Sequence, residues 1–186
     1  MREGLEDDPH PSPDPGERVA AVLAVLIEEP QPALLFTERA ASLSRHPGEV
    51  SFPGGLTEPQ DTDLAATALR ETHEEIGLDP ALPDVLGALP AIHTFVSGVL
   101  VTPFVAAIRS LPRLRESRAE IARVLTVPTV TLAALEEQRD LQRDGGRVWR
   151  GWWYETEDAT IWGATGFMLH AFLEHARARA PWLTSS

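Results

Sequence analysis

The residues Arg70–Leu78 read Arg-Glu-Thr-His-Glu-Glu-Ile-Gly-Leu, and this stretch decides the fold. Most of it belongs to a longer segment, Asp61–Ile76, in which apolar residues recur at the spacing of one helix face. The pattern predicts a helix that begins at Asp61 or Thr62, since both residue types cap helix starts. We expect the helix to end at Gly77, because glycine is common just after a helix.

The same helix carries three glutamates, Glu71, Glu74 and Glu75, whose i, i+3 and i+4 spacing puts their carboxylates on one face. Three like charges repel one another, and no lysine stands among them. Divalent cations with oxygen ligands relieve such repulsion, and Mg²⁺ characteristically binds carboxylates together with substrate phosphates. Most clusters of this kind are solvated acidic helix faces, but the neighbouring glycines and arginine favour a metal site.

Apolar runs on either side of this helix predict a sheet. The strands we expect are 19–27, 33–37, 85–91, 99–108 with a break at Pro103, 121–127 and 147–155, the last after a hairpin turn at 144–146. Residues 39–55 read as an ordered loop, and further helices are expected at 129–139 and 163–179. This order of elements predicts an α/β fold in which a mixed sheet lies between helices.

The start of the chain differs in character from the rest. Residues 1–17 are acidic and carry prolines at positions 9, 11, 13 and 15. Such a segment buries little apolar surface, so we expect a flexible, acidic, proline-rich tail. Residues 18–186 are long enough to bury a substantial core, and we expect them to form a single domain.

Composition excludes several classes of function. The net charge of −12 lacks the basic footprint of a nucleic-acid-binding protein. The chain has no cysteine, which excludes disulfides, thiolate metal sites and cysteine nucleophiles and suits a reducing compartment. No apolar stretch is long enough to cross a bilayer or to form a secretion signal. We therefore expect a cytoplasmic protein without membrane or nucleic-acid partners.

The residues around this helix resemble the signature of the Nudix hydrolases, G-x5-E-x7-R-E-U-x-E-E-x-G-U, in which U is a bulky aliphatic residue. Residues 70–78 match it everywhere except at Thr72, and Gly55 matches the leading glycine. Asp61 takes the place of the first glutamate, and eight residues rather than seven separate it from Arg70. That insertion is similar to the coenzyme A-directed branch of the family. The resemblance implies a Nudix-type α/β/α sandwich.

The resemblance to the coenzyme A branch continues upstream of the glycines. That branch has a pattern close to L-L-T-x-R-S-x3-R-x3-G-x3-F-P-G-G, which residues 34–55 resemble, and two of the departures from it matter. Ala40 replaces the serine, and Ser44 stands where the arginine is expected. Arg147–Trp149 and Trp162-Gly163 also look like this branch. The departures leave substrate choice more open than reaction type.

The resemblance implies roles for the helix residues. Glu71, Glu74 and Glu75 would bind Mg²⁺ or Mn²⁺, which neutralises pyrophosphate oxygens, orients the substrate and acidifies a water. The backbone carbonyl of Gly54 or Gly55 would be a further metal ligand. Arg70 would hold a ligand carboxylate in place.

A general base is harder to assign, because Nudix enzymes often recruit a glutamate from outside the signature. Glu120 is the candidate, since it precedes an apolar strand where relatives of this branch carry a glutamate. An exposed glutamate at a strand edge is an equally good interpretation. His73 and His93 are weaker candidates, because a lone histidine is more often structural.

Three basic residues, Arg39, Arg45 and His46, precede the glycines and could bind substrate phosphates as charge-assisted donors. Coenzyme A carries a 3′-phosphate that ADP-ribose lacks, so a basic cluster here favours it. The leading prediction is hydrolysis of coenzyme A or acyl-coenzyme A to 3′,5′-ADP and 4′-phosphopantetheine. The alternatives are a Nudix enzyme for ADP-ribose, NADH or another nucleoside diphosphate derivative, and a non-catalytic nucleotide-binding module. A homodimer is compatible with all three.

Overall fold

The computed structural model describes residues 1–7, 9, 12–41, 48–94, 98–142 and 148–185. Its elements are β1 (Arg18–Ile27), β2 (Ala33–Arg39), β3 (Val50–Ser51), β4 (Gly54–Leu56), α1 (Leu64–Ile76), β5 (Asp84–Ala88), β6 (Ile92–Thr94), β7 (Val99–Ile108), β8 (Ile121–Pro128), α2 (Thr129–Leu135), β9 (Glu137–Gln142), β10 (Val148–Glu155), β11 (Thr160–Ile161), α3 (Gly163–Arg179) and the 3-10 turn η1 (Pro181–Leu183). In the part of the chain so described, no helix is long and apolar enough to cross a membrane.

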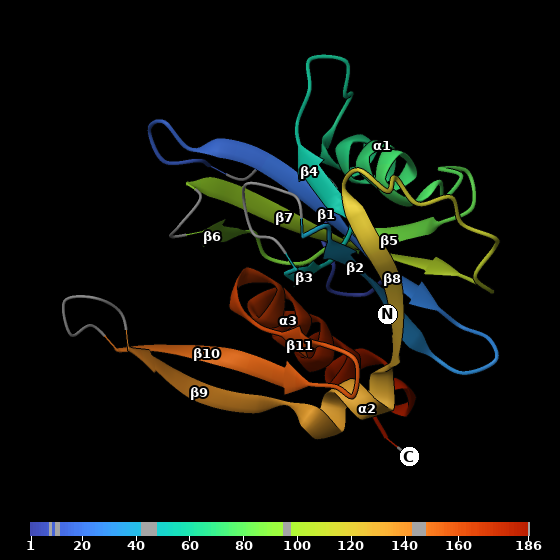
Figure 1. Ribbon diagram of the computed structural model, residues 1–186, viewed down its shortest axis with the longest axis vertical. Helices are drawn as coiled ribbons and strands as arrows, with labels where there is room; N and C mark the ends of the chain where they lie inside the picture. Colours follow the sequence, from blue (N-terminus) through green and yellow to red (C-terminus); the bar gives the residue numbers. More distant parts are fainter. Residues whose placement is uncertain (8, 10–11, 42–47, 95–97, 143–147, 186) are drawn as a thin grey trace.

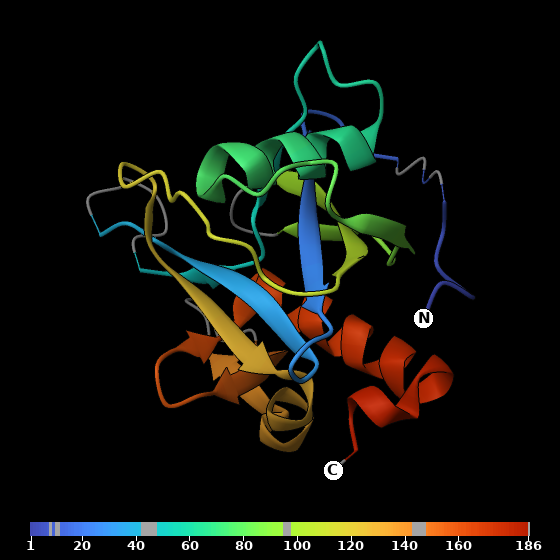
Figure 2. The same cartoon turned by 90° about the vertical axis from the view of Figure 1, so that its right-hand side faces the viewer.

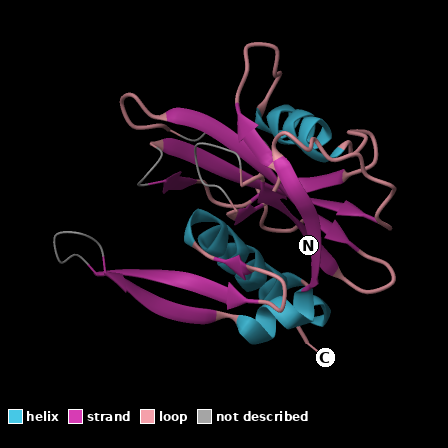
Figure 3. Cartoon of the chain, viewed as in Figure 1, coloured by secondary structure: helices cyan, strands magenta, loops and turns pink. Residues whose placement is uncertain are grey.

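The main sheet is mixed, as the sequence predicts. Its strands run in the order β3-β2-β1-β7-β5, while β4 pairs with β1, β6 with β7 and β8 with β2. β1 and β7 are parallel along their whole length, and the other pairs are antiparallel. β9, β10 and β11 form a second, three-stranded sheet, and the β9–β10 hairpin extends away from the rest of the chain (Figure 3).

Helices cover both faces of the main sheet, with α1 on one side and α3 on the other (Figures 1 and 2). Both faces of the sheet need a cover because alternate side chains of β1 pack in two separate cores, one on each face. Ala21, Leu23 and Val25 pack in the core that contains Ala68 and Ile76 of α1. The intervening residues pack with α3; they are Ala20, Val22, Ala24 and Leu26. The predicted α/β sandwich with a mixed sheet between helices is therefore confirmed.

The catalytic helix candidate, α1, starts later than the sequence predicts. Its N-cap is Asp63, whose side chain accepts a hydrogen bond from the backbone N–H of Ala66 at 2.7 Å, and not Asp61 or Thr62. The carboxylate of Asp61 is engaged elsewhere, with Arg70. The helix ends at Gly77 as predicted, with a left-handed φ of 70° that glycine adopts without strain.

Three other predicted boundaries are wrong. β7 runs unbroken through Pro103, which lies between the segments of β7 that pair with β5 and with β6, so no pairing on that side needs its missing N–H. The helix expected at 129–139 stops at Leu135, because Glu137–Gln142 forms β9. Residues 39–55, expected as a loop, contain the short strands β3 and β4. The hairpin turn expected at 144–146 lies outside the described residues.

The described part of the segment 1–17 makes defined contacts with the domain. The backbones of Glu6 and Ala88 exchange hydrogen bonds of 3.0 and 2.7 Å beside β5. Met1 and Leu5 pack against the core on the α3 side, and the Met1 carbonyl lies 2.6 Å from Nε2 of His175. The flexibility expected for residues 1–17 stays a prediction. The contacts of the described residues in this segment argue against it.

The second sheet is joined to α3 by a polar network around Glu136. Its Oε1 accepts hydrogen bonds from the Tyr154 hydroxyl at 2.8 Å and from His170 at 2.9 Å, and Arg177 contacts Oε2 at 2.7 Å. Trp152 stacks on His170 with ring centroids 3.7 Å apart. Trp152 of β10 therefore packs against α3.

Candidate metal and catalytic site

The three glutamates of the signature occupy the second half of α1 in three different environments. The side chain of Glu74 is 55% exposed and that of Glu71 is 19% exposed. Glu75 is buried, with 6% of the residue exposed. Glu75 is therefore the innermost of the three carboxylates, and Glu74 faces solvent.

Glu75 is a buried carboxylate with an unused oxygen. The backbone N–H of Gly54 donates a hydrogen bond to it, and Arg39 is near enough to attract it, but Oε2 has no hydrogen-bond partner. Burial, with smaller contributions from the charges of Glu71 and Glu120, raises the pKa of Glu75 to about 8. A divalent cation at Oε2 would satisfy this oxygen and favour the ionised carboxylate, so the donor set fits a hard metal ion.

The two glycines of β4 let this strand lie close to both β1 and α1. β4 pairs with β1 through Gly54↔Val22 and Gly55↔Ala21. At Gly54 the φ is 151°, and a Cβ atom would collide with the backbone of Ala21. At Gly55 a Cβ atom would lie 2.5 Å from the carboxylate carbon of Glu71. The position of the Glu71 carboxylate therefore depends on the absence of a side chain at residue 55.

The Gly55→Ala variant should show whether the position of the Glu71 carboxylate affects activity independently of folding. The new methyl group meets only the movable end of Glu71, so we expect little change in the free energy of unfolding. Displacing that carboxylate by about 1 Å should lower kcat about 100-fold. Gly54→Ala is the contrasting control, because its methyl group meets backbone and should destabilise the fold. Urea unfolding and initial rates measured on both variants check this, and an active Gly55→Ala enzyme would contradict it.

Arg70 is partly buried among carboxylates and holds the loop before α1. Its Nε and Nη2 donate to the two oxygens of Asp61 at 2.8 and 3.0 Å, and Nη2 also donates to the Leu56 carbonyl at 3.0 Å. Its Nη1 lies 2.9 Å from Glu71 and 3.4 Å from Glu74. Arg70 thus contacts two of the three glutamates, and its role in positioning metal ligands stays a prediction.

Asp61 is the main partner of Arg70. The sequence shows only that Asp61 stands in place of the first glutamate of the signature. The Asp61 side chain is 5% exposed and also accepts hydrogen bonds from the Thr67 hydroxyl and the Glu58 N–H, each at 2.8 Å. The Arg70 guanidinium holds the pKa of this carboxyl well below its usual range. Thr72, the departure from the signature, is accommodated because its hydroxyl donates to the Ala68 carbonyl at 2.7 Å within the helix.

Two more predicted site residues lie beside Glu75. Arg39, at the end of β2, lowers the pKa of Glu75 by its positive charge, and its buried Nε has no hydrogen-bond partner. Glu120, just before β8, is exposed and raises the pKa of Glu75 by its negative charge. The loop that carries Glu120 is fixed to α1 by the bond from the Ser117 N–H to the Glu75 carbonyl at 2.8 Å. The fold therefore brings Arg39, Glu75 and Glu120 together.

Two other predicted residues, His73 and His93, are not part of this group. Arg45, His46 and Arg147 lie outside the described residues. His73 Nδ1 lies 3.1 Å from the Leu78 carbonyl at the end of α1, and His93 Nδ1 lies 2.9 Å from Glu17. Both histidines have structural partners, which favours the structural interpretation over a role as general base.

The carboxylates of α1 are not gathered around one point in this structure. The described residues contain one group whose ligand atoms all lie within 4.8 Å of each other, and it is Asp14, Glu17 and His93. Glu71 and Glu74 turn toward Arg70, whereas Glu75 turns toward Gly54. A cation shared by the three requires rotation of Glu71 and Glu74 about their side-chain bonds. A cavity of about 560 Å³ lies at the other end of α1, and none of the three glutamates lines it.

Comparison with known proteins agrees with this geometry. The family model of the NUDIX domain matches residues 17–160. The chain is 39% identical over 152 residues to the "Uncharacterized Nudix hydrolase NudL" of Enterobacter sp. (strain 638), covering 80% of this chain and 77% of that protein. The protein of the same name from Salmonella paratyphi B is 38% identical over 157 residues, covering 82% and 80%. The solution structure of the E. coli ORF135 protein has a TM-score of 0.53 at 18% identity, covers 91% of this chain and 99% of that one, and supports the fold alone.

Proposed function

Because this chain belongs to the Nudix family of hydrolases, we propose that it cleaves the pyrophosphate bond of coenzyme A or an acyl-coenzyme A with the help of a divalent cation. The products are 3′,5′-ADP and 4′-phosphopantetheine, or its acyl form. The observation that carries the reaction type is the buried Oε2 of Glu75, a carboxylate oxygen without a hydrogen-bond partner, in a side chain that lies near Gly54 and Arg39. The preference for coenzyme A rests on the sequence pattern upstream of these glycines.

In this mechanism, the residues of the chain hold and orient the reacting groups. Glu71, Glu74 and Glu75 provide the oxygen ligands for Mg²⁺ or Mn²⁺. When bound, such an ion neutralises pyrophosphate charge and lowers the pKa of a water near the phosphorus. Positioning and electrostatic stabilisation then supply most of the rate, because phosphoryl transfer needs little covalent help from the protein.

Arg70, Arg39 and Glu120 complete the set of roles. Arg70 keeps Glu71 and Glu74 in place through Nη1 and does not touch substrate. Arg39 has a buried Nε without a partner and can donate it to a phosphate oxygen. Glu120 is exposed beside Glu75 and can accept the proton of the attacking water as general base. The substrate is a small nucleotide, and a cytoplasmic location and a homodimer remain predictions of the sequence.

Incubation with Mg²⁺ and one substrate at a time, followed by chromatography of the products, tests the proposal. We expect coenzyme A to yield 3′,5′-ADP faster than ADP-ribose or NADH is cleaved, and EDTA to stop the reaction. Glu74→Gln is the inactive control. Faster cleavage of ADP-ribose or NADH would keep the reaction type and remove the coenzyme A assignment. That second candidate is favoured by the departures from the branch pattern at Ala40 and Ser44.

Arg39→Gln tests the proposed phosphate contact. Loss of one charge-assisted hydrogen bond should lower kcat/KM for coenzyme A about 10- to 100-fold, with folding unchanged. Arg109→Gln is the matched control, because the Arg109 side chain is 81% exposed and pairs with Glu29 just past the end of β7. Steady-state kinetics on both variants give the answer, and equal kcat/KM values for the two would rule out the contact.

A further inference from the structure

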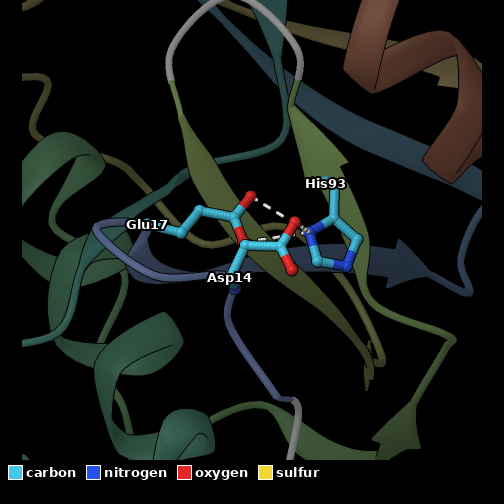
Figure 4. A group of neighbouring side chains, drawn as sticks. All are labelled: Asp14, Glu17 and His93. Carbon is cyan, nitrogen blue, oxygen red and sulfur yellow. Dashed lines mark hydrogen bonds and ion pairs between the residues drawn. The ribbon is translucent and has the colours of Figure 1, made fainter.

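A second set of metal-ligand side chains lies away from α1. Asp14 and Glu17 stand in the turn before β1, and His93 stands on β6, 76 residues after Glu17 (Figure 4). Each offers one ligand atom, and these atoms lie within 4.8 Å of one another. No sequence motif predicts this group, because its members are far apart along the chain.

The backbone holds the three residues together without help from an ion. The Glu17 N–H donates to the Asp14 carbonyl, and the Asp14 N–H donates to Glu17 Oε2, each at 2.9 Å. β7 pairs with both flanking strands at the same residue, since Val99 lies opposite Arg18 of β1 and opposite Thr94 of β6. The turn and β6 are therefore fixed side by side through β7.

The distances suit a cation between the side chains. His93 Nδ1 lies 2.9 and 3.1 Å from the two oxygens of Glu17 and 3.9 Å from Asp14 Oδ2. Ligand atoms around one transition-metal ion are separated by roughly 3 Å, given metal–ligand bonds of about 2.1 Å. A proton on Nδ1 can occupy the space between His93 and Glu17, and a cation would replace it. The Asp14 side chain is 81% exposed, so it can rotate to close the remaining distance.

We propose that Asp14, Glu17 and His93 bind a divalent transition-metal ion such as Zn²⁺ or Mn²⁺ at a site separate from α1. One imidazole and two carboxylates suit these ions, whereas Mg²⁺ prefers oxygen ligands alone. The Glu17 side chain is 9% exposed, and a cavity of about 340 Å³ beside the group leaves room for water ligands. The net charge of −12 favours any bound cation. The inference does not depend on the proposed enzyme activity.

The test uses untagged protein in which Glu71, Glu74 and Glu75 are replaced by glutamine, so that α1 no longer offers carboxylates. Isothermal titration with Zn²⁺ at neutral pH should show one ion bound per chain, and titration with Mg²⁺ should show none. His93→Ala in the same background should weaken Zn²⁺ binding at least about 10-fold. Asp14→Asn should weaken it as well, with folding unchanged because the residue is exposed. Asp84→Asn, which removes an exposed carboxylate paired with Arg2, is the matched control and should bind as its parent does.

Two results would overturn the proposal. One is that the triple glutamine protein, folded by circular dichroism, binds no Zn²⁺. The other is that His93→Ala binds Zn²⁺ with the stoichiometry and affinity of its parent. In either case the group is only a hydrogen-bonded cluster of one histidine and two carboxylates. If the parent protein does not cleave coenzyme A while the triple variant still binds Zn²⁺, this site stands and the proposed function is removed.

Discussion

Replacing Glu75 by glutamine should lower kcat/KM for coenzyme A about 1,000-fold without loss of stability. The amide keeps an oxygen that can accept the Gly54 N–H, but it removes the negative charge that would bind the cation. Glu75 is buried and its pKa is raised to about 8, so the protein gains little from ionising it in the absence of a metal. We therefore expect the melting temperature of the metal-free variant to equal or exceed that of the parent.

Glu28→Gln is the matched control for Glu75→Gln, and the reaction rate and the melting temperature are measured for both variants. Glu28 is exposed just past the end of β1, so its replacement should leave both quantities unchanged. A Glu75→Gln enzyme that keeps its activity would remove the metal role of this residue. Equal losses of folding and activity would show instead that the carboxylate is structural.

Replacing Asp61 by asparagine should have the largest effect on stability. The variant leaves the Arg70 guanidinium, whose side chain is 17% exposed, without its bidentate partner. Removing one partner of a buried ion pair should lower the free energy of unfolding by about 3 kcal/mol. Activity should fall too, since Arg70 positions Glu71. Urea unfolding at pH 7 measures the change. The control Asp84→Asn breaks an exposed pair with Arg2 and should cost less than about 1 kcal/mol.

The effect of Asp61→Asn should depend on pH. The pKa of Asp61 is depressed in the folded protein, so its contribution to stability is complete above the unfolded-state pKa of about 3.9. That contribution is lost as the pH falls below this value toward the folded-state pKa. The stability difference between parent and variant should therefore shrink between pH 5 and pH 3. A difference that stays constant over this range would mean that the ion pair is not its source.

The long elements could be predicted because their signals are local. The apolar run of β1 indicates a strand covered on both faces, and the striped segment Gly163–Arg179 is the whole of α3. Gly77 marks the end of α1 because its left-handed conformation favours glycine. Strands of two or three residues, such as β3 and β11, contain no period and were not predicted. The predicted helix extends into residues 137–139, the start of β9, because the strand form of β9 depends on pairing with β10.

For the candidate site, the sequence gives the residue types, and only the fold gives their partners. The signature identifies the glutamates of α1 together with Arg70, but not the fact that Glu75 alone is buried with an unused oxygen. The N-cap was misassigned for the same reason, because Asp61 is drawn away from the helix start by Arg70. The proximity of Arg39 and Glu120 to Glu75 requires β2 and β8 to pair, which no motif encodes.

The most direct test of the central claim is the location of the metal in a crystal grown with Mn²⁺. An anomalous difference map should contain a peak within bonding distance of Glu75 and of at least one of Glu71 and Glu74. The same map also tests metal binding by Asp14, Glu17 and His93, because a peak beside His93 would be independent of any peak at α1. A map with no peak within bonding distance of Glu75, in protein that cleaves coenzyme A under the same conditions, would contradict the assignment of α1 as the metal-binding and catalytic helix.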